Sequence, residues 1–229
     1  STGDPNYYND KYGVYKSTDG GATWLPSSNG MDLRMAVEIL MHPFDHNTLT
    51  AATTDGIFKT TDGGANWVNV KAGGAFKDMV YQPGSSTVIF AVDDNSFWRS
   101  ANSGNSWTQI NSVNPAVGNG GRIAVTAANS NTVYAAFVGT NSPSGDGGII
   151  YRSTDGGLNF SLRKGDVQPN LNGYEPNEDG QGNYNWCIFA DRNKANTVYV
   201  GGHVVWKSTN GGSTWTKMTN WYENCHTDM

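Results

Sequence analysis

One eight-residue phrase occurs five times in this 229-residue chain, and it constrains the fold more than any other feature. The motif begins with Ser or Thr and has Asp or Asn at its third position. Its fifth residue is glycine and its eighth is aromatic. The third copy is the least regular, because it has serine at the fourth position where the others have glycine. The five copies are Ser17–Trp24, Thr60–Trp67, Ser100–Trp107, Ser153–Phe160 and Ser208–Trp215. Their closing aromatic residues are 43, 40, 53 and 55 residues apart. A period of roughly 40–50 residues indicates a repeat architecture, in which each unit needs neighbours to bury its apolar face.

Strand-like runs surround every copy of the phrase. These runs alternate with period two and are rich in β-branched and aromatic residues, as strands are. In a complete unit two runs, such as Ala36–Leu40 and Thr48–Ala52, precede a third, Gly56–Lys59, and a fourth follows the phrase. Four short strands per period, joined by tight turns, are the unit of a β-propeller. A β-sandwich with fortuitous repeats is the alternative, and five matched turns disfavour it.

The predicted fold class is therefore all-β, a β-propeller of four-stranded antiparallel blades with about five units present. We treat residues 1–229 as a single propeller segment. Its units end near Trp24, Trp67, Trp107, Phe160 and Trp215.

The phrase itself has the chemistry of a hairpin connection. Asp or Asn accepts hydrogen bonds from the backbone N–H groups just ahead of it, which closes a tight turn. The glycines supply positive φ angles, and the aromatic residue brings a large apolar surface back over the sheet. We expect these residues to be structural, since a change from Asp to Asn keeps the acceptor. They are Asp19, Asp62, Asn102, Asp155 and Asn210, with Trp24, Trp67, Trp107, Phe160 and Trp215.

The phrase S/T-x-D-x-G-x-x-W resembles the Asp box, or BNR repeat, of sialidases, sortilin-type propellers and two-propeller xyloglucan-cleaving glycosidases. The unit that runs through His42–Trp67 is most similar to propellers of large secreted bacterial surface proteins of the sortilin-like kind. The resemblance implies a propeller fold, a secreted or cell-surface location, and Asp boxes at the periphery, away from any substrate site.

Both ends of the chain fall inside a unit, which gives four complete blades and half of another. A propeller ring that does not close leaves exposed sheet edges. We therefore expect an incomplete part of a larger propeller, with about six to ten blades by the resemblance. The rest of a larger polypeptide is then one partner of this segment.

Long loops on one face of the propeller are the predicted binding region, because binding residues concentrate on loops held by a rigid scaffold. They cover residues 4–11, 139–148, 166–185 and 220–228. Aromatic rings beside acidic and amide groups suit a glycan or a protein partner, although the same rings also suit packing between blades. The candidate ligand-binding residues are Tyr7, Tyr8, Tyr174, Tyr184, Trp186, Trp221 and Tyr222.

A glycoside hydrolase of the xyloglucan-cleaving kind is the alternative function. Such chemistry needs two carboxyl groups across the scissile bond. By the resemblance, Asp4 is the nearest match to a catalytic aspartate and Asp55 is the next, and the pattern departs at Gly3 and lacks the flanking glycines after Asp4. A sialidase needs three converging arginines, but Arg99 and Arg152 occupy a cation position before the box that lysine fills in other units. We therefore favour a binding module over an enzyme; a structural spacer is the third reading.

Composition narrows the partners further. Charged residues make up 15% of the chain and the net charge is −5, which argues against nucleic-acid binding. No run of 18 apolar residues is present, so we expect no membrane span. We expect no cofactor and no metal site, although residues 177–180 could hold calcium through oxygen ligands. Whether Cys187 and Cys225 form a disulfide stays open.

Overall fold

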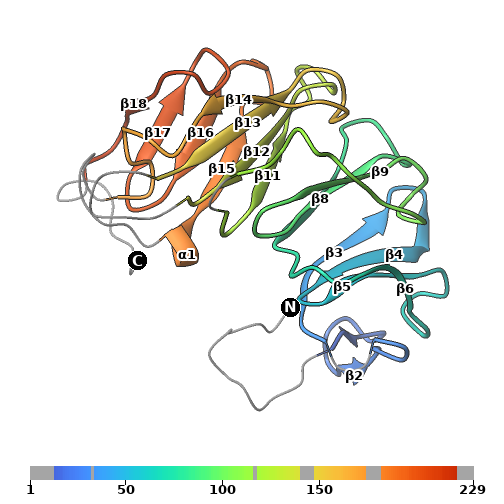
Figure 1. Ribbon diagram of the computed structural model, residues 1–229. Coiled ribbons are helices and arrows are strands. Elements are labelled where there is room, and N and C mark those ends of the chain that lie inside the picture. The colour runs from blue at the N-terminus through green and yellow to red at the C-terminus, as the bar shows by residue number, and fades with distance from the viewer. Residues whose placement is uncertain (1–12, 32–33, 116–117, 140–146, 174–181, 221–229) are drawn as a thin grey trace.

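The computed structural model describes residues 13–31, 34–115, 118–139, 147–173 and 182–220. Within them the chain forms one two-stranded sheet and four four-stranded antiparallel sheets, which follow one another along an arc (Figure 1). In each complete sheet the strands lie in sequence order, as in a propeller blade. The predicted all-β propeller fold, present as an incomplete propeller, is confirmed.

The first sheet holds β1 (Tyr15–Lys16) and β2 (Leu25–Pro26). The second holds β3 (Ala36–His42), β4 (Asp45–Thr53), β5 (Gly56–Thr60) and β6 (Val68–Ala72). The third holds β7 (Asp78–Tyr81), β8 (Ile89–Val92), β9 (Phe97–Ser100) and β10 (Thr108–Gln109). The fourth holds β11 (Arg122–Val125), β12 (Val133–Phe137), β13 (Ile149–Ser153) and β14 (Ser161–Lys164). The fifth holds β15 (Cys187–Ala190), β16 (Val198–Gly201), β17 (Val205–Ser208) and β18 (Thr216–Lys217), after a four-residue helix, α1 (Gly182–Asn185).

Apolar side chains pack between successive sheets. One of the two largest clusters joins the third and fourth sheets, where the rings of Phe97 and Phe160 lie 4.6 Å apart between centroids. The innermost strands β3, β7, β11 and β15 also contact one another in that order. The closing aromatic residue of the fourth box therefore packs against the preceding sheet.

Strands β3 and β4 extend beyond the runs Ala36–Leu40 and Thr48–Ala52 that the sequence predicts. They continue to His42 and from Asp45, so their connection is shorter than those runs indicate. A register shift at Met41/His42 absorbs the extra residues as a bulge. The Asp45 carboxylate accepts hydrogen bonds from Asn47 N and Thr48 Oγ1, the local contacts of an Asx turn, which fix the bulged segment.

Each Asp box closes on its own hydrogen bonds. In the second box Asp62 Oδ1 accepts from the Asn66 backbone N–H at 2.9 Å and from the Thr60 hydroxyl at 2.7 Å. The Thr60 hydroxyl in turn accepts from Gly64 N at 3.1 Å. The other four boxes repeat these contacts, with Asn102 and Asn210 in place of aspartate. These hydrogen bonds close the turn of each box.

A cation from one sheet binds the box of the next. Lys16 Nζ donates to Gly63 O, Lys59 Nζ to Ser103 O and Arg99 Nε to Gly156 O, at distances of 2.8–2.9 Å. All three acceptors are the fourth residue of a box. Between the fourth and fifth sheets the donor is instead Arg163 of β14, whose Nε donates to Gly211 O at 3.0 Å. The cation position before the first three boxes therefore joins neighbouring blades.

Position 103 tests the turn geometry directly. Among the described residues Ser103 is the only non-glycine with positive φ, at 56°, and the other four boxes have glycine there. Its hydroxyl donates to Ser86 O at 3.0 Å, which offsets part of the strain. We expect Ser103→Ala to unfold more readily than Ser103→Gly by about 1 kcal/mol, since alanine keeps the strain and loses the bond. Thermal unfolding of both variants checks this order, and an alanine variant as stable as the glycine variant would contradict it.

The boxes also predict a response to acid. Hydrogen bonds from the Asn66 side chain and backbone lower the pKa of Asp62 from 3.8 to about 2. A folded-state pKa below the unfolded value stabilises the fold above about pH 4, and that contribution is lost as the pH falls towards 2. We therefore expect Asp62→Asn, the amide found naturally in two boxes, to lose less stability between pH 5 and pH 2.5 than the wild type. Urea unfolding at the two pH values measures the difference; equal losses would mean that Asp62 is not the acid-sensitive group.

Candidate functional site

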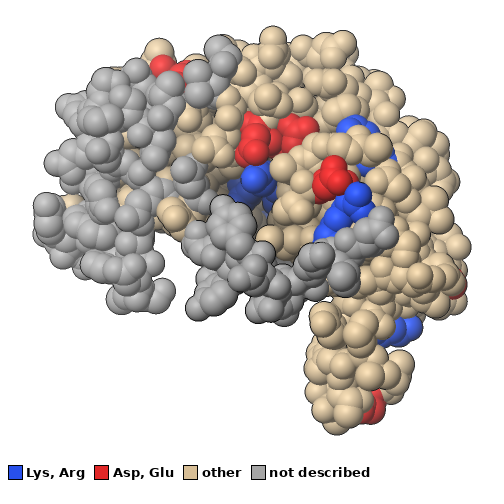
Figure 2. Space-filling model, turned by 60° about the horizontal axis from the view of Figure 1, so that its bottom comes forward, with Lys and Arg blue, Asp and Glu red and all other residues tan. Residues whose placement is uncertain are grey.

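The connections from second to third strand, and from one blade to the next, lie on one face of the arc, which we call the axial face. It is the lower face in Figure 1, on which α1 lies. Figure 2 brings this face forward and shows lysine, arginine, aspartate and glutamate side chains gathered around a hollow, within a mostly uncharged surface. The boxes lie at the opposite ends of the strands, because they join third to fourth strands.

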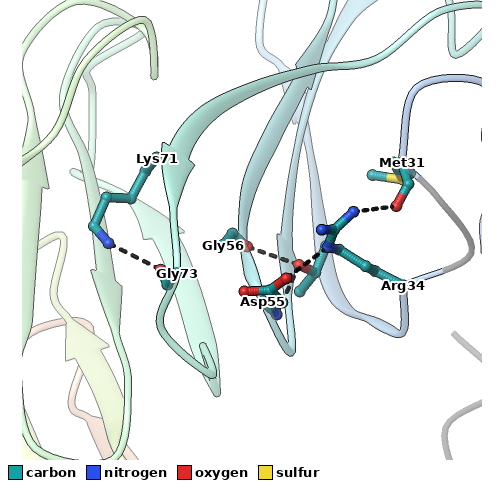
Figure 3. A network of polar contacts seen from close by, with 7 residues as sticks. Met31, Arg34, Asp55, Gly56, Lys71 and Gly73 are labelled. Atoms are coloured by element: carbon teal, nitrogen blue, oxygen red, sulfur yellow. Dashed lines mark hydrogen bonds and ion pairs between the residues drawn. The ribbon is translucent and has the colours of Figure 1, made fainter.

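Arg34 and Asp55 form the first element of this region (Figure 3). Arg34 Nε lies 2.9 Å from Asp55 Oδ2, and Arg34 also donates to Met31 O at 3.0 Å. The guanidinium lies 5.3 Å from the ring centroid of Phe58. The side chains of Arg34 and Asp55 are 28% and 57% exposed, so the pair is both fixed and accessible.

Lys71, at the end of β6, is the second charged group of the axial face. Its Nζ donates to Ala72 O at 2.6 Å and Gly73 O at 2.9 Å, and lies 4.2 Å from the ring centroid of Trp98 (Figure 3 shows the Gly73 bond). The indole N–H of Trp98 donates to Asp93 Oδ2 at 3.1 Å. These contacts hold the ammonium over the ring, as a cation–π interaction requires.

Lys77 and Asp94 form a third element, with Nζ 3.5 Å from Oδ2. Asp94 Oδ1 also accepts from Gly120 N at 3.0 Å, so this carboxylate joins the third sheet to the segment that leads into the fourth. The pair is about one-third exposed, which leaves room for a ligand to contact either charge.

The inner strands add two carboxyl groups that the sequence analysis did not single out, Glu38 of β3 and Asp78 of β7. Burial raises the pKa of Asp78, although Ile123 N donates to it at 2.8 Å and Arg122 is nearby, which both act to lower that pKa. Burial also raises the pKa of Glu38, and the charge of Asp78 adds to that increase. The only sequence signal was their common position on first strands that come together in space.

A buried polar cluster supports the loops of the fourth and fifth sheets. Lys164 Nζ donates to the carbonyl oxygens of Gly147, Gly148, Gly165 and Val167, at 2.6–3.2 Å. Asn172 is fully buried and donates to Val138 O at 2.6 Å. The contacts fasten the ends of two long connections to the rigid sheets.

The predicted ligand-binding residues fall into three groups. Tyr184, on α1, is 75% exposed on the axial face. Trp186 is only 2% exposed and packs in the cluster between the fourth and fifth sheets, so its assignment to a ligand surface is corrected: it is a core residue that precedes β15. The others lie outside the described residues: Tyr7, Tyr8, Tyr174, Trp221 and Tyr222.

Of the two catalytic candidates, Asp55 lies on the axial face and is held by Arg34. Asp4 lies outside the described residues. The part of the chain that the structure describes holds no group of three His, Cys, Asp or Glu residues placed to bind a metal ion. The calcium candidate at residues 177–180 lies outside that part. Cys187 is an exposed free thiol, and Cys225 again lies outside.

No helix among the described residues is long and apolar enough to cross a membrane.

Comparison with solved structures shows the fold. The chain superposes on an ancestral GH74 enzyme with 22% identity and a TM-score of 0.62, covering 90% of this chain and 25% of that one. It superposes on a GH74 xyloglucanase from Xanthomonas campestris with 16% identity and a TM-score of 0.54, covering 86% and 32%. An extracellular domain from B. thetaiotaomicron gives 12% identity and a TM-score of 0.54, covering 86% and 23%. The chain thus spans between about a quarter and a third of these structures.

No curated protein matches the chain. A family model does: Sortilin-Vps10, described as sortilin, neurotensin receptor 3, matches residues 95–228. The match covers more than half of the chain and includes the last three boxes, which agrees with the sortilin-like resemblance of the repeat. The chain belongs to the Sortilin-Vps10 family.

Proposed function

We propose that this chain is part of an extracellular or cell-surface β-propeller that binds a glycan or a protein partner on its axial face. The observation that carries the proposal is the set of fixed, part-exposed charges around the hollow of that face (Figure 2). The remaining blades of a larger polypeptide are its second partner.

The axial groups are organised before any ligand arrives. Arg34, Lys71 and Asp94 each have a hydrogen bond to the backbone, so binding does not have to order flexible side chains. Their exposed atoms offer both donors and acceptors, which suits hydroxyl, amide or charged groups on a partner. The Tyr184 ring adds a surface for stacking.

The extracellular location and the glycan class are supported by resemblance. Among proteins of similar fold, one is described as an extracellular domain and another as a xyloglucanase. The Asp boxes and the membership of the Sortilin-Vps10 family also support an extracellular location. No charge pattern on the chain favours nucleic acid.

A calorimetric binding screen tests the proposal. The panel is xyloglucan oligosaccharides, sialylated oligosaccharides and short mixed-charge peptides, and any binder is then titrated into variants. We expect Arg34→Ala with Lys77→Ala to weaken binding about tenfold or more. Leu158→Ala, at an exposed box position, is the control and leaves binding unchanged. If Leu158→Ala abolishes binding of the ligand and Arg34→Ala with Lys77→Ala does not, the binding site lies on the box face and the proposal is refuted.

A glycoside hydrolase is the second candidate, and one observation favours it. Glu38 and Asp78, from neighbouring inner strands, both have raised pKa values, as a general acid needs. Glu38→Gln and Asp78→Asn would each abolish release of reducing ends from xyloglucan if this candidate is correct. Hydrolysis that survives both changes, or that the wild type never shows, rejects it.

A further inference from the structure

The junction between the fourth and fifth sheets carries two guanidinium groups, because Arg163 is added to Arg152, the cation that precedes the fourth box. Arg163 is the third residue after the closing aromatic residue of its box. In the other units the same position holds a small or apolar residue: Ser27, Val70, Ile110 and Met218. An arginine at this position departs from the repeat and makes this junction different from the other three.

A β-bulge directs Arg163 towards the next blade. The pairing of β13 with β14 skips this residue, because the register shifts between Ile150 and Tyr151. Bulges often change the direction of a side chain in this way. Arg163 Nε donates to Gly211 O and Nη2 donates to Asn210 O, both at 3.0 Å. The guanidinium is therefore fixed on the backbone of the fifth box.

Arg152 approaches the same box from β13. Its Nη2 donates to Asn196 Oδ1, and its guanidinium carbon lies 5.7 Å from the ring centroid of Tyr134. A Cβ built on Gly211 would lie 2.6 Å from Arg152 Nη1, so this guanidinium also lies beside Gly211. The two positive charges thus meet at one glycine of the fifth box.

No carboxylate in the described part of the chain neutralises these two charges. The fifth box has the amide Asn210 where the first, second and fourth boxes have aspartate. Among the described residues neither arginine forms an ion pair. Asp155 is bonded within its own box, and Asp191 accepts from the backbone of its own turn. The junction therefore holds two positive charges without a counter-charge.

Both guanidinium groups also have donors to spare. Each carries five N–H donors, and within the described residues the two together make three hydrogen bonds. Arg152 Nε is buried without an acceptor, whereas Nη1 of each arginine is neither bonded nor buried. Fixed guanidinium groups with free terminal donors are the groups that recognise oxyanions in proteins.

We propose that Arg152 and Arg163 bind a tetrahedral oxyanion, phosphate or sulfate, at the box end of the fourth and fifth sheets. Nη1 of each arginine donates to the anion. A doubly charged oxyanion matches the two positive charges, whereas a carboxylate neutralises only one. The β15–β16 turn adds Arg192 and Lys194 against a single Asp191, which increases the positive field around the junction. The site lies at the opposite ends of the strands from the axial charges and does not depend on what those charges bind.

The other described junctions lack this combination. Lys59 is only 8% exposed and donates to two acceptors of the third box, so its ammonium is occupied. Lys16 and Arg99 are each a single cation, and the boxes that they bind contain Asp62 and Asp155. Arg99 therefore provides a matched control, because it is an arginine in the same box contact with a carboxylate in the box.

Titration of the full chain with inorganic phosphate and with sulfate, at constant ionic strength, tests the site. We expect saturable shifts of backbone amide NMR signals centred on residues 196 and 210–212, and much weaker binding of acetate. A sulfated monosaccharide distinguishes two sources of the anion. If it binds more tightly than inorganic sulfate, the group is carried on a glycan; if it binds more weakly, the ligand is a free anion. Either order supports the site.

Variants that introduce residues found elsewhere in the repeat locate the contact. Arg163→Met inserts the residue found at position 218, and Asn210→Asp inserts the carboxylate of three other boxes. We expect each to weaken anion binding about tenfold or more, because the first removes a charged donor and the second adds a like charge. Arg99→Lys, the control, leaves binding unchanged. Urea unfolding confirms that the three variants are folded.

Three results would overturn the proposal. The first is the absence of saturable binding of either anion above that of acetate. The second is binding that Arg163→Met and Asn210→Asp leave unchanged, and the third is equal weakening by Arg99→Lys. Binding of an axial ligand is expected to survive Arg163→Met. Loss of anion binding with axial binding intact would therefore concern only this site, and the reverse result would concern only the proposed function.

Discussion

Lys164→Met is expected to destabilise the fold by about 3–5 kcal/mol, because leaving a single buried acceptor without a hydrogen bond costs about 1–3 kcal/mol and several are affected here. The methionine keeps the length of the side chain but donates no hydrogen bond. Four carbonyl oxygens that now share one ammonium, those of Gly147, Gly148, Gly165 and Val167, would lose it together. The residue is only 6% exposed, so water does not readily replace the lost donor.

Lys207→Met is the matched control. Lys207 is part-exposed, and its contact is with the face of the Tyr199 ring, at 5.6 Å from Nζ to the centroid. An exposed contact of this kind contributes about 0.5–1 kcal/mol. Urea unfolding midpoints of the two variants give the comparison, and amide exchange should show the loss of Lys164 first in residues 147–148 and 165–167. Similar midpoints would mean that the stability of the segments bearing these four carbonyl oxygens does not depend on the Lys164 ammonium.

The fold was predictable from sequence because its determinants are local. Each box closes through contacts within eight residues, and the hydroxyl, carboxylate and glycine positions are all visible in the sequence. Even the changes to Asn102 and Asn210 could be interpreted, since the amide oxygen accepts the same backbone bonds. The cation before each box was noticed too, although its partner lies about 40–60 residues away in the next blade and had to come from the structure.

The candidate site was less predictable because it depends on neighbouring blades. Glu38 and Asp78 look like ordinary polar positions of two alternating strands, and only the arrangement of the sheets brings them close. Trp186 shows the opposite difficulty: an indole beside a long loop fits a binding surface and a core equally well in the sequence, and its burial against the fourth sheet decides between them. Sequence patterns predict which residues alternate along a strand, not which blade faces they meet.

Gly157→Ala is the second change with a large expected effect. Gly157 is the fifth residue of the fourth box and has φ of 77°, where a Cβ is strained. A Cβ built there would lie 2.6 Å from Cε1 of Phe90, a fully buried ring of the third sheet that packs 5.7 Å from Phe97 between centroids. Because the ring cannot move into solvent, the sheets must separate. We expect a loss of about 2–5 kcal/mol, from about 1–2 for the backbone and about 1–3 for overpacking.

Gly21→Ala separates these two contributions. Gly21 holds the same position in the first box with φ of 92°, but the nearest atom to its added Cβ is 4.0 Å away, in the residue's own box. The first sheet has no preceding sheet among the described residues, so the substitution meets only the backbone strain. We therefore expect Gly21→Ala to lose about 1–2 kcal/mol in urea unfolding, and the excess loss in Gly157→Ala to measure how closely one blade fits the next. Equal losses in the two variants would contradict the tight contact between box and preceding blade, and with it the radial packing on which the propeller depends.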